Sequence, residues 1–299
     1  MDNKDFLKQA KKYAEAFRVT DGSTFRLKQV DPDDTLDFDS DDKPKAQEAL
    51  ACAVELLTKL QDKLYAQDRW AVLIIFQALD AAGKDSAIKH VMSGVNPQGC
   101  EVSSFKAPSA EELDHDFLWR CAKRVPERGR IGIFNRSYYE ETLVVRVHPE
   151  YLAGQKLPQT PKDLWQQRFE DISNFERFLT NQGVAVLKFF LHVSKKEQRE
   201  RFLERIDNPA KNWKFSMQDV NERAHWDEYM NAYEQTIRNT ASDFAPWYVV
   251  PADHKWFTRL VVASAIVEKL DSLKLEYPTL GKEELKELEQ ARQTLLAKE

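Results

Sequence analysis

One stretch constrains the fold of this chain more than any other: an apolar run that leads directly into a glycine and a lysine. Residues 72–76, VLIIF, form a continuous and largely β-branched run, which is typical of a strand buried on both faces. A turn of small residues follows and ends in Gly83-Lys84, and a helical pattern then begins. In this context backbone N–H groups and a lysine can surround a phosphate at a helix N-terminus. The loop is therefore a candidate phosphate site.

The loop departs from a strict P-loop, which reads Gly-x4-Gly-Lys-Ser/Thr. Ala78 occupies the first glycine position, and Asp85 stands where the magnesium-binding hydroxyl would be. As a bare pattern, the segment fits equally well a loop that only connects a strand to a helix. Asp80 favours the phosphate site, because a carboxylate there would repel a phosphate by several kcal/mol unless a divalent cation lay between them. We therefore expect Asp80 to bind Mg²⁺.

Further apolar runs and helical patterns alternate along the chain. They predict an α/β fold with a parallel sheet and right-handed crossovers. Before the phosphate-loop strand, apolar positions at helical spacing predict a helix from Lys45 to Gln67. After it, we expect a capping box formed by Ser109 and Glu112 at the start of another helix. The remaining strands are predicted at residues 101–105, 130–134, 184–193 and 247–250, which gives five in total.

Polar residues follow these strands directly. Residues 135–140, NRSYYE, come after the strand at 130–134, and Asp253-His254-Lys255 come after the last strand, again at a carboxyl edge. In open parallel sheets ligands bind beyond the carboxyl ends of the strands, so residues 135–140 should face the same crevice as the loop. Arg136 could form only a surface ion pair, worth under roughly 1 kcal/mol. Its position favours a bidentate phosphate clamp instead.

The segment from Ser194 to Lys214 is rich in charge. It contains seven basic and four acidic residues, a surplus of three bases, in a chain whose formal net charge is −5. Arg201 and Arg205 are four residues apart and would share one helix face. Asn208-Pro209 should end that helix, and a second helix should begin near Ser216 and carry an aromatic stripe. The pair could form a movable flap over phosphates, although such charge also suits a solvated face.

The aromatic stripe consists of Trp226, Tyr229 and Tyr233. At this helical spacing aromatic residues are more often part of the core than a platform for stacking bases. We therefore expect these three side chains to pack inside the protein.

Composition excludes several classes of protein. The chain has 299 residues, of which 42% are hydrophobic and 31% charged, as in soluble globular proteins. It has no apolar run near the roughly 20 residues that span a bilayer, and its N-terminus is too charged for a signal peptide. We therefore expect a cytoplasmic protein. The negative net charge argues against general nucleic-acid binding, and the widely spaced Cys52, Cys100 and Cys121 suggest core thiols.

We expect both ends of the chain to be peripheral. Residues 31–42 carry seven aspartates without the glycine and glutamate of an EF-hand, and we interpret them as a solvated linker. The predicted organisation is an N-terminal extension and acidic linker (1–43), a central domain (44–270) with a lid at about 195–225, and a helical tail (271–299). The tail could pack on the body or on another subunit.

Together these motifs resemble the type-2 polyphosphate kinases from about Phe25 to Leu270. The resemblance rests on the loop at 79–85, the segments 96–99 and 104–109, Phe134-Asn135-Arg136-Ser137, the basic segment 201–214, and residues 245–256. It implies magnesium-dependent phosphoryl transfer between inorganic polyphosphate and AMP, ADP or ATP. The implied fold is a three-layer α/β/α, P-loop kinase-like fold with a five-stranded parallel sheet and a helical lid. Homo-oligomers are also implied.

The resemblance assigns roles to individual residues. Asp80 would bind magnesium and orient the transferring phosphoryl group, while Lys84 and Arg136 would neutralise its charge. Many members have aspartate at the position of Asn135, and the asparagine form resembles the subgroup that phosphorylates both AMP and ADP. The other residues expected to contact substrates are Ala81, Ala82, Gly83, Asp85, Lys106, Arg201, Arg205, Lys211 and Lys214.

Two other functions fit the same residues. An ATP-dependent nucleoside monophosphate kinase would share the fold and the loop, but would use ATP without polyphosphate. A nucleotide-sensing or scaffolding protein with an inactive loop would bind nucleotide without turning it over, and the departures at Ala78 and Asn135 allow that reading.

Overall fold

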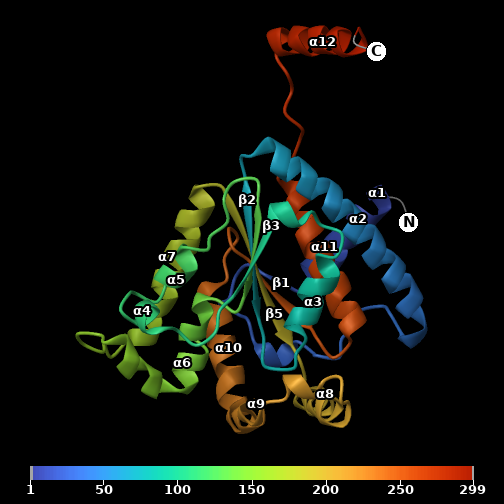
Figure 1. Ribbon diagram of the computed structural model, residues 1–299. Coiled ribbons are helices and arrows are strands. Elements are labelled where there is room, and N and C mark those ends of the chain that lie inside the picture. The colour runs from blue at the N-terminus through green and yellow to red at the C-terminus, as the bar shows by residue number, and fades with distance from the viewer. Residues whose placement is uncertain (1–2, 298–299) are drawn as a thin grey trace.

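The central sheet runs through the whole molecule (Figure 1). The computed structural model describes residues 3–297, and within them six strands form one sheet in the order β1-β6-β5-β2-β4-β3. The five predicted parallel strands are present: β2 (Ala71–Gln77), β3 (Cys100–Ser104), β4 (Ile131–Asn135), β5 (Val184–His192) and β6 (Trp247–Pro251). The predicted total of five is wrong, because the short β1 (Arg18–Val19) pairs antiparallel with β6. Two residues are too few to leave a periodic signal.

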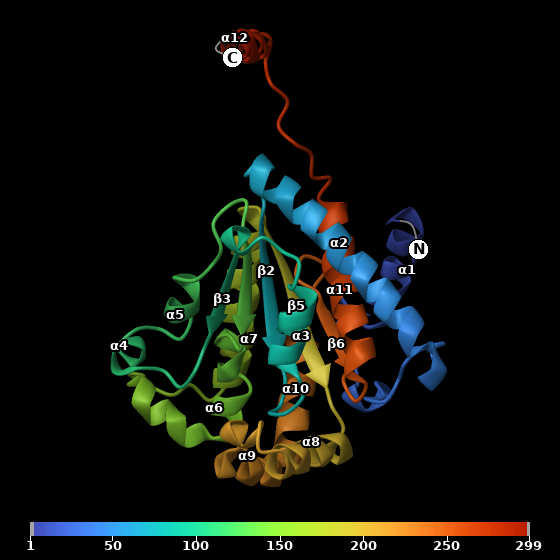
Figure 2. The same cartoon turned by 45° about the vertical axis from the view of Figure 1, so that its right-hand side comes forward.

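Helices cover both faces of the sheet and make the three layers predicted (Figure 2). The first layer contains α1 (Asn3–Ala16), α2 (Lys43–Gln67), α3 (Lys84–Val91) and α11 (Lys255–Ser272). The second layer is built mainly from α7 (Leu164–Asn181) and α10 (Trp226–Thr240), with short helices beside them: α4 (Ala110–Leu113), α5 (Trp119–Ala122) and α6 (Val144–Val147). The predicted capping box of Ser109 and Glu112 opens α4.

The two layers explain the continuous apolar run of β2. Alternate side chains along a strand point to opposite faces. Val72, Ile74 and Phe76 pack in the core beneath the first layer. Leu73 and Ile75 pack beneath the second layer. Every residue of β2 is therefore buried, and its one polar residue, Gln77, stands at its end.

The sheet topology brings three loops together at one edge. β2 lies between β4 and β5, with Phe76 opposite Asn135 and Gln77 opposite Phe190. All three strands are parallel, so the segments after Gln77, Asn135 and His192 leave the sheet on the same side. The predicted lid lies beyond this edge (Figure 1).

The lid has more breaks than the sequence predicts. α8 (Lys195–Asp207) ends at Asn208, as expected from Asn208-Pro209. A 3-10 turn, η6 (Asn212–Lys214), and a short helix, α9 (Met217–Glu222), follow. The expectation of one helix from Ser216 through Tyr233 is wrong, because the 3-10 turn η7 (Arg223–His225) separates α9 from α10.

The terminal segments differ in how they contact the body. Most aspartates of the acidic segment are exposed, but Leu36 and Phe38 pack against the core, so the segment is not simply a solvated linker. Residues 273–281 lead to α12 (Lys282–Leu296), which stands clear of the body in both views (Figures 1 and 2). The last residues of the predicted tail, 298–299, lie outside the described part of the chain.

Two further expectations concern the cysteines and the membrane. Cys121 is buried, while Cys52 and Cys100 are half-buried beside the core. Burial raises the pKa of Cys100 to about 11 and that of Cys121 to about 12, as expected for inert core thiols. Among residues 3–297, no helix combines the length and the apolar composition that a bilayer-spanning segment needs.

Candidate functional site

The loop between β2 and α3 turns sharply at two residues. Ala81 and Gly83 have φ angles of 62° and 110°, in the left-handed region that favours glycine. Gly83 caps α3, so the backbone N–H groups at the start of the helix face the loop. Ala78, in contrast, is not among the described residues with positive φ, and its side chain packs in the core. The turn therefore does not need glycine at position 78, which explains the first departure from the P-loop pattern.

Lys84 lies under this loop. Its side chain is buried, and Nζ donates to the carbonyl oxygen of Ala78 at 2.7 Å. Burial lowers the pKa of Lys84, while the carboxylates of Asp80 and Glu140 oppose that shift. A desolvated ammonium interacts more strongly with a phosphate than one in bulk water, because the local dielectric is low.

Arg136 joins the loop to the end of β4. Its Nη2 donates to Oδ1 of Asp80 at 3.0 Å, and its Nη1 lies 3.8 Å from Oε2 of Glu140. The neighbouring carboxylate of Glu140 is the main cause that raises the pKa of Arg136. The backbone of Arg136 has a φ of 65°, a strained conformation for a residue other than glycine. Asp80, Lys84 and Arg136 are therefore brought together, as predicted.

Glu140 also belongs to this cluster; it lies in the segment 135–140 that was expected to face the crevice, but it was not selected as a site residue. Burial raises its pKa, and the positive charges of Arg136 and Lys84 oppose the increase. Its place beyond the carboxyl end of β4 could have selected it, whereas its contact with Arg136, four residues earlier, depends on the local backbone. The structure shows a 3-10 turn at Tyr138–Glu141.

A buried polar network supports the strained segment around Arg136. The hydroxyls of Tyr138 and Tyr139 both donate to Oε1 of Glu176, at 2.9 and 2.7 Å. Lys188 of β5 donates to the other oxygen of Glu176 at 2.6 Å, and both side chains are fully buried. This network holds the residues that follow Arg136 against the core. It thereby stabilises the strained backbone conformation of Arg136.

Asn135 contacts the loop from the other side. Its Nδ2 donates to Oδ1 of Asp85 at 2.8 Å. An amide can donate this hydrogen bond, whereas an ionised carboxylate cannot. The second departure from the P-loop pattern, Asp85, is thus paired with the asparagine at position 135.

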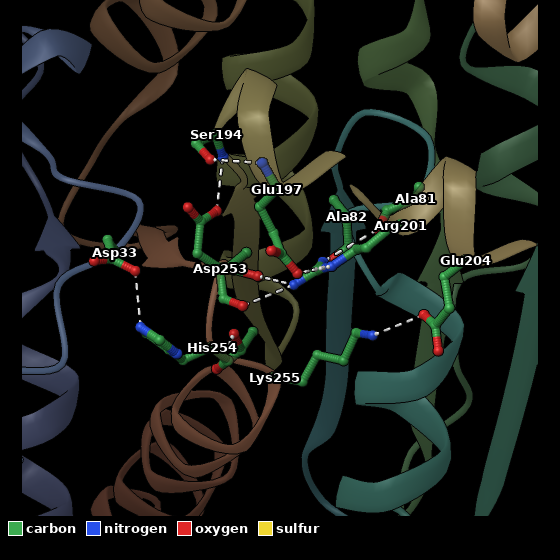
Figure 3. Close-up of polar contacts among 12 residues, drawn as sticks. Asp33, Ala81, Ala82, Ser194, Glu197, Arg201, Glu204, Asp253, His254 and Lys255 are labelled. Carbon is green, nitrogen blue, oxygen red and sulfur yellow. Dashed lines mark hydrogen bonds and ion pairs between the residues drawn. The ribbon is translucent and has the colours of Figure 1, made fainter. Parts of the chain in front are cut away.

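Arg201 ties the lid to the loop (Figure 3). Its guanidinium donates to the carbonyl oxygens of Ala81 and Ala82, at 3.1 and 2.7 Å, and to those of Ala252 and Asp253. Its Nε donates to Glu197 one turn earlier on α8. In this conformation Arg201 uses its donors within the protein, so it positions the lid and the loop relative to each other.

A broad cavity of about 590 Å³ opens beside the loop. Twelve of the thirteen predicted site residues line it, whereas Ala82 is buried and is absent from the lining. Lys255 and Arg259, at the start of α11, also line the cavity but were not predicted as site residues. The position of Lys255 after the last strand could have identified it. The basic residues of the lining are Lys84, Lys106, Arg136, Arg201, Arg205, Lys211, Lys214, Lys255 and Arg259.

The charge of this cavity contrasts with that of the chain. Among the described residues, nine Lys and Arg line it against three acids, Asp80, Asp85 and Glu204, in a protein whose formal net charge is −5. Lys211 forms an ion pair with Glu204, and Arg205 lies 3.6 Å from Asp219. The arrangement can therefore bind an extended polyanion.

A second, small cavity of about 40 Å³ lies on the other side of Asp80. The predicted aromatic stripe of α10 is buried, as expected, and Trp226, Tyr229 and Tyr233 also line this cavity. Gln198 of α8 closes it by donating to the backbone oxygen of Asp80 at 2.9 Å. The two cavities share Leu79, Asp80 and Arg136. Asp80 and Arg136 therefore stand between a basic space and an aromatic one.

The part of the chain that the structure describes contains no group of three or more His, Cys, Asp and Glu side chains able to hold a metal ion. Mg²⁺ at phosphoryl-transfer sites is commonly held by one or two carboxylates together with substrate phosphates and water. Asp80, which is partly exposed at the junction of the two cavities, fits that kind of donor set.

Comparison with known proteins identifies the relatives of this chain. The model of the Polyphosphate kinase 2 (PPK2) family matches residues 39–278. An ADP-polyphosphate phosphotransferase of Rhodopseudomonas palustris is 55% identical over 85% of this chain and 89% of its own. An AMP/ADP-polyphosphate phosphotransferase of Meiothermus ruber is 47% identical over 88% of this chain and 94% of its own.

A solved structure agrees with these matches. Polyphosphate kinase 2 from Arthrobacter aurescens superimposes with a TM-score of 0.85 and 38% identity, over 96% of this chain and 97% of that one. The family match covers more than half of the chain, and both the sequence relatives and the structure extend over most of it. The chain therefore belongs to the polyphosphate kinase 2 family.

Proposed function

We propose that this protein transfers a phosphoryl group between inorganic polyphosphate and AMP or ADP in a magnesium-dependent reaction. The observation that carries the proposal is the broad cavity, where nine basic side chains outnumber three acids in an acidic chain. Polyphosphate has no base to recognise, so a donor site can be built from Lys and Arg alone. Each charge-assisted hydrogen bond contributes on the order of 1.5–3 kcal/mol.

The residues around the loop suit phosphoryl transfer. That reaction mainly requires positioning and neutralisation of charge, and needs no covalent nucleophile from the protein. Lys84 and Arg136 lie where they would stabilise charge on the transferring group, and Gly83 permits a close approach of the backbone. Asp80 would hold Mg²⁺, which when bound neutralises charge on the phosphate oxygens. Arg201 holds the lid in a fixed position relative to the loop.

The acceptor is assigned to the side of Asp80 where the small cavity lies. Three aromatic side chains in its lining offer a surface for a nucleoside beside the carboxylates of Glu140, Asp219 and Glu222, and Arg136 also lines the donor cavity. A volume of about 40 Å³ holds only one or two water molecules. Entry of a nucleotide therefore requires α9 and the start of α10 to move outward, as in other kinases whose lids close over the substrates.

The names of the relatives support the choice of acceptor. The Rhodopseudomonas relative is named for ADP, and the Meiothermus relative for both AMP and ADP. We propose that this protein also accepts both nucleotides, and that it works in the cytoplasm as a homo-oligomer. An ATP-dependent nucleoside monophosphate kinase is not favoured, because these relatives are named as polyphosphate phosphotransferases.

The test compares donors with the purified full-length chain and Mg²⁺. Initial rates are measured for polyphosphate with AMP, polyphosphate with ADP, and ATP with AMP in the absence of polyphosphate. We expect ATP to form from ADP and polyphosphate, and this reaction to stop when Mg²⁺ is chelated. Turnover with ATP and AMP alone would instead support the monophosphate kinase, and binding without any turnover would support a sensing role.

Two substitutions test the site assignment. Lys84→Ala and Asp80→Ala are each expected to lower the turnover of ADP and polyphosphate by at least about 100-fold, because each removes charge next to the transferring group. Lys89→Ala, on an exposed position of the same helix, is the matched control. Near wild-type turnover in both site variants, with thermal stability retained, would contradict the assignment.

A further inference from the structure

The helix α12 has an apolar stripe that nothing in the described chain covers. Leu285, Leu288, Leu295 and Leu296 are 54–71% exposed, and no residue of α12 is buried. The helix stands apart from the body in both views (Figures 1 and 2). An isolated helix of 15 residues is only marginally stable in water, so its stability depends on burying an apolar face.

The linker limits where α12 can dock on its own subunit. Leu275 is buried in the core, and the hydroxyl of Tyr277 donates to Asp62 of α2 at 2.6 Å. From Tyr277 the chain can extend about 17 Å to the first residue of α12. The surface of α2 around Asp62 exposes one large apolar side chain, Tyr65, and the guanidinium of Arg130 already lies over its ring. Within its described residues, α2 therefore offers the stripe no large apolar side chain that is free of other contacts.

A second copy of the same helix does match the stripe. Leu285, Leu288, Arg292 and Leu295 are spaced three, four and three residues apart, which is the seam of a two-helix pair. In an antiparallel pair with its two-fold axis beside Gln290, Leu285 faces Leu295 of the other copy. Leu288 would then pack on the aliphatic stem of Arg292, whose guanidinium lies 4.0 Å from Glu289 of its own helix and would also come within reach of Glu289 of the other copy. A parallel pair in register would place two Arg292 side chains against each other.

We propose that α12 is an association arm that pairs antiparallel with α12 of a second copy of this chain. The contact is symmetric, as expected for a dimer with a two-fold axis. Charge complementarity between Glu289 and Arg292 sets the orientation, and the leucines supply the buried apolar surface. The inference is independent of the proposed reaction, because none of these residues lies at the phosphate site.

Sedimentation velocity of the full-length chain over a range of concentrations tests the arm. Leu288→Glu and Leu295→Glu are each expected to raise the dissociation constant by about tenfold or more, since each removes apolar burial in both copies. Polyphosphate-dependent turnover per subunit should remain unchanged. Equal dissociation constants for the wild type and both variants would overturn the proposal, as would a monomeric wild type whose thermal stability falls on Leu288→Glu.

A charge exchange tests the antiparallel orientation. Glu289→Arg and Arg292→Glu should each weaken association, and the double variant should restore it, because the ion pairs between copies are re-formed in reverse. Glu283 and Lys286 have the same spacing and charges on the opposite face of the helix, so Glu283→Arg and Lys286→Glu are matched controls. Weakening by the controls to the same extent, or no rescue in the double variant, would reject the antiparallel pair.

Discussion

The amide of Asn135 lies against the carboxylate of Asp85, with Nδ2 2.8 Å from Oδ1. This contact links the end of β4 to the first turn of α3, and it depends on one neutral and one charged partner. The contact indicates how this site tolerates a carboxylate at position 85.

Asn135→Asp should lower the free energy of unfolding at pH 7 by about 1 kcal/mol, because it replaces a hydrogen bond with two adjacent carboxylates. The effect is small because Asp85 is exposed and its charge is screened. Chemical denaturation at low ionic strength measures it. The exchange variant Asn135→Asp with Asp85→Asn restores the pair and should recover the loss. A single variant as stable as the wild type would contradict this role of the pair.

At the scale of elements, one side chain of α8 bonds both the loop and the segment after β6, while Gln198 adds a second bond to the loop. Arg201 donates to carbonyl oxygens in both segments, so it sets the position of the lid over the broad cavity (Figure 3). A guanidinium can direct several hydrogen bonds at once in a fixed plane, whereas a lysine ammonium is a point charge on a flexible stem.

Arg201→Lys should lower kcat for ADP and polyphosphate by about 10- to 100-fold. The charge is retained, but the lid is no longer held in its position relative to the loop. Steady-state kinetics measure the change, and circular dichroism checks that the fold persists. Arg199→Lys is the control, since Arg199 lies on the same helix and faces solvent. If both variants turned over at the wild-type rate, Arg201 would have no positioning role.

Elements with a strong local period could be predicted from the sequence, and elements that depend on tertiary contacts could not. The five parallel strands and the break at Asn208-Pro209 have local causes, namely apolar runs and a proline. The pairing of β1 and the packing of Phe38 depend on distant surfaces. In the site, the carboxyl-edge rule located Asp80 and Arg136. The same rule placed the segment of Glu140 at the crevice, but the contact of Glu140 with Arg136 depends on a 3-10 turn that the rule does not predict.

At the scale of the whole molecule, the N-terminal segment closes over the end of β5, where His192 is buried. Asp253 N donates to the carbonyl oxygen of Pro32 at 3.1 Å, and Oδ1 of Asp253 accepts from Ser194 N at 2.8 Å. His192 is 7% exposed, and its Nδ1 has no partner within the described chain. Burial lowers the pKa of His192 to about 4, although Asp253, Asp31 and the backbone of Val30 oppose the decrease.

This depressed pKa makes the stability of the whole fold depend on pH. Between pH 6.5 and 4 the unfolded chain binds a proton at His192 and the folded protein does not, so acid favours unfolding. The contribution is fully present above pH 6.5 and is lost as the pH falls towards 4. The total loss is about 3 kcal/mol, at about 1.4 kcal/mol per unit of pKa. Chemical denaturation at fixed protein concentration across this range, compared with His192→Gln, isolates the effect. The wild type should lose its stability relative to the variant as the pH falls, and parallel pH profiles for the two proteins would show that His192 does not couple protonation to folding.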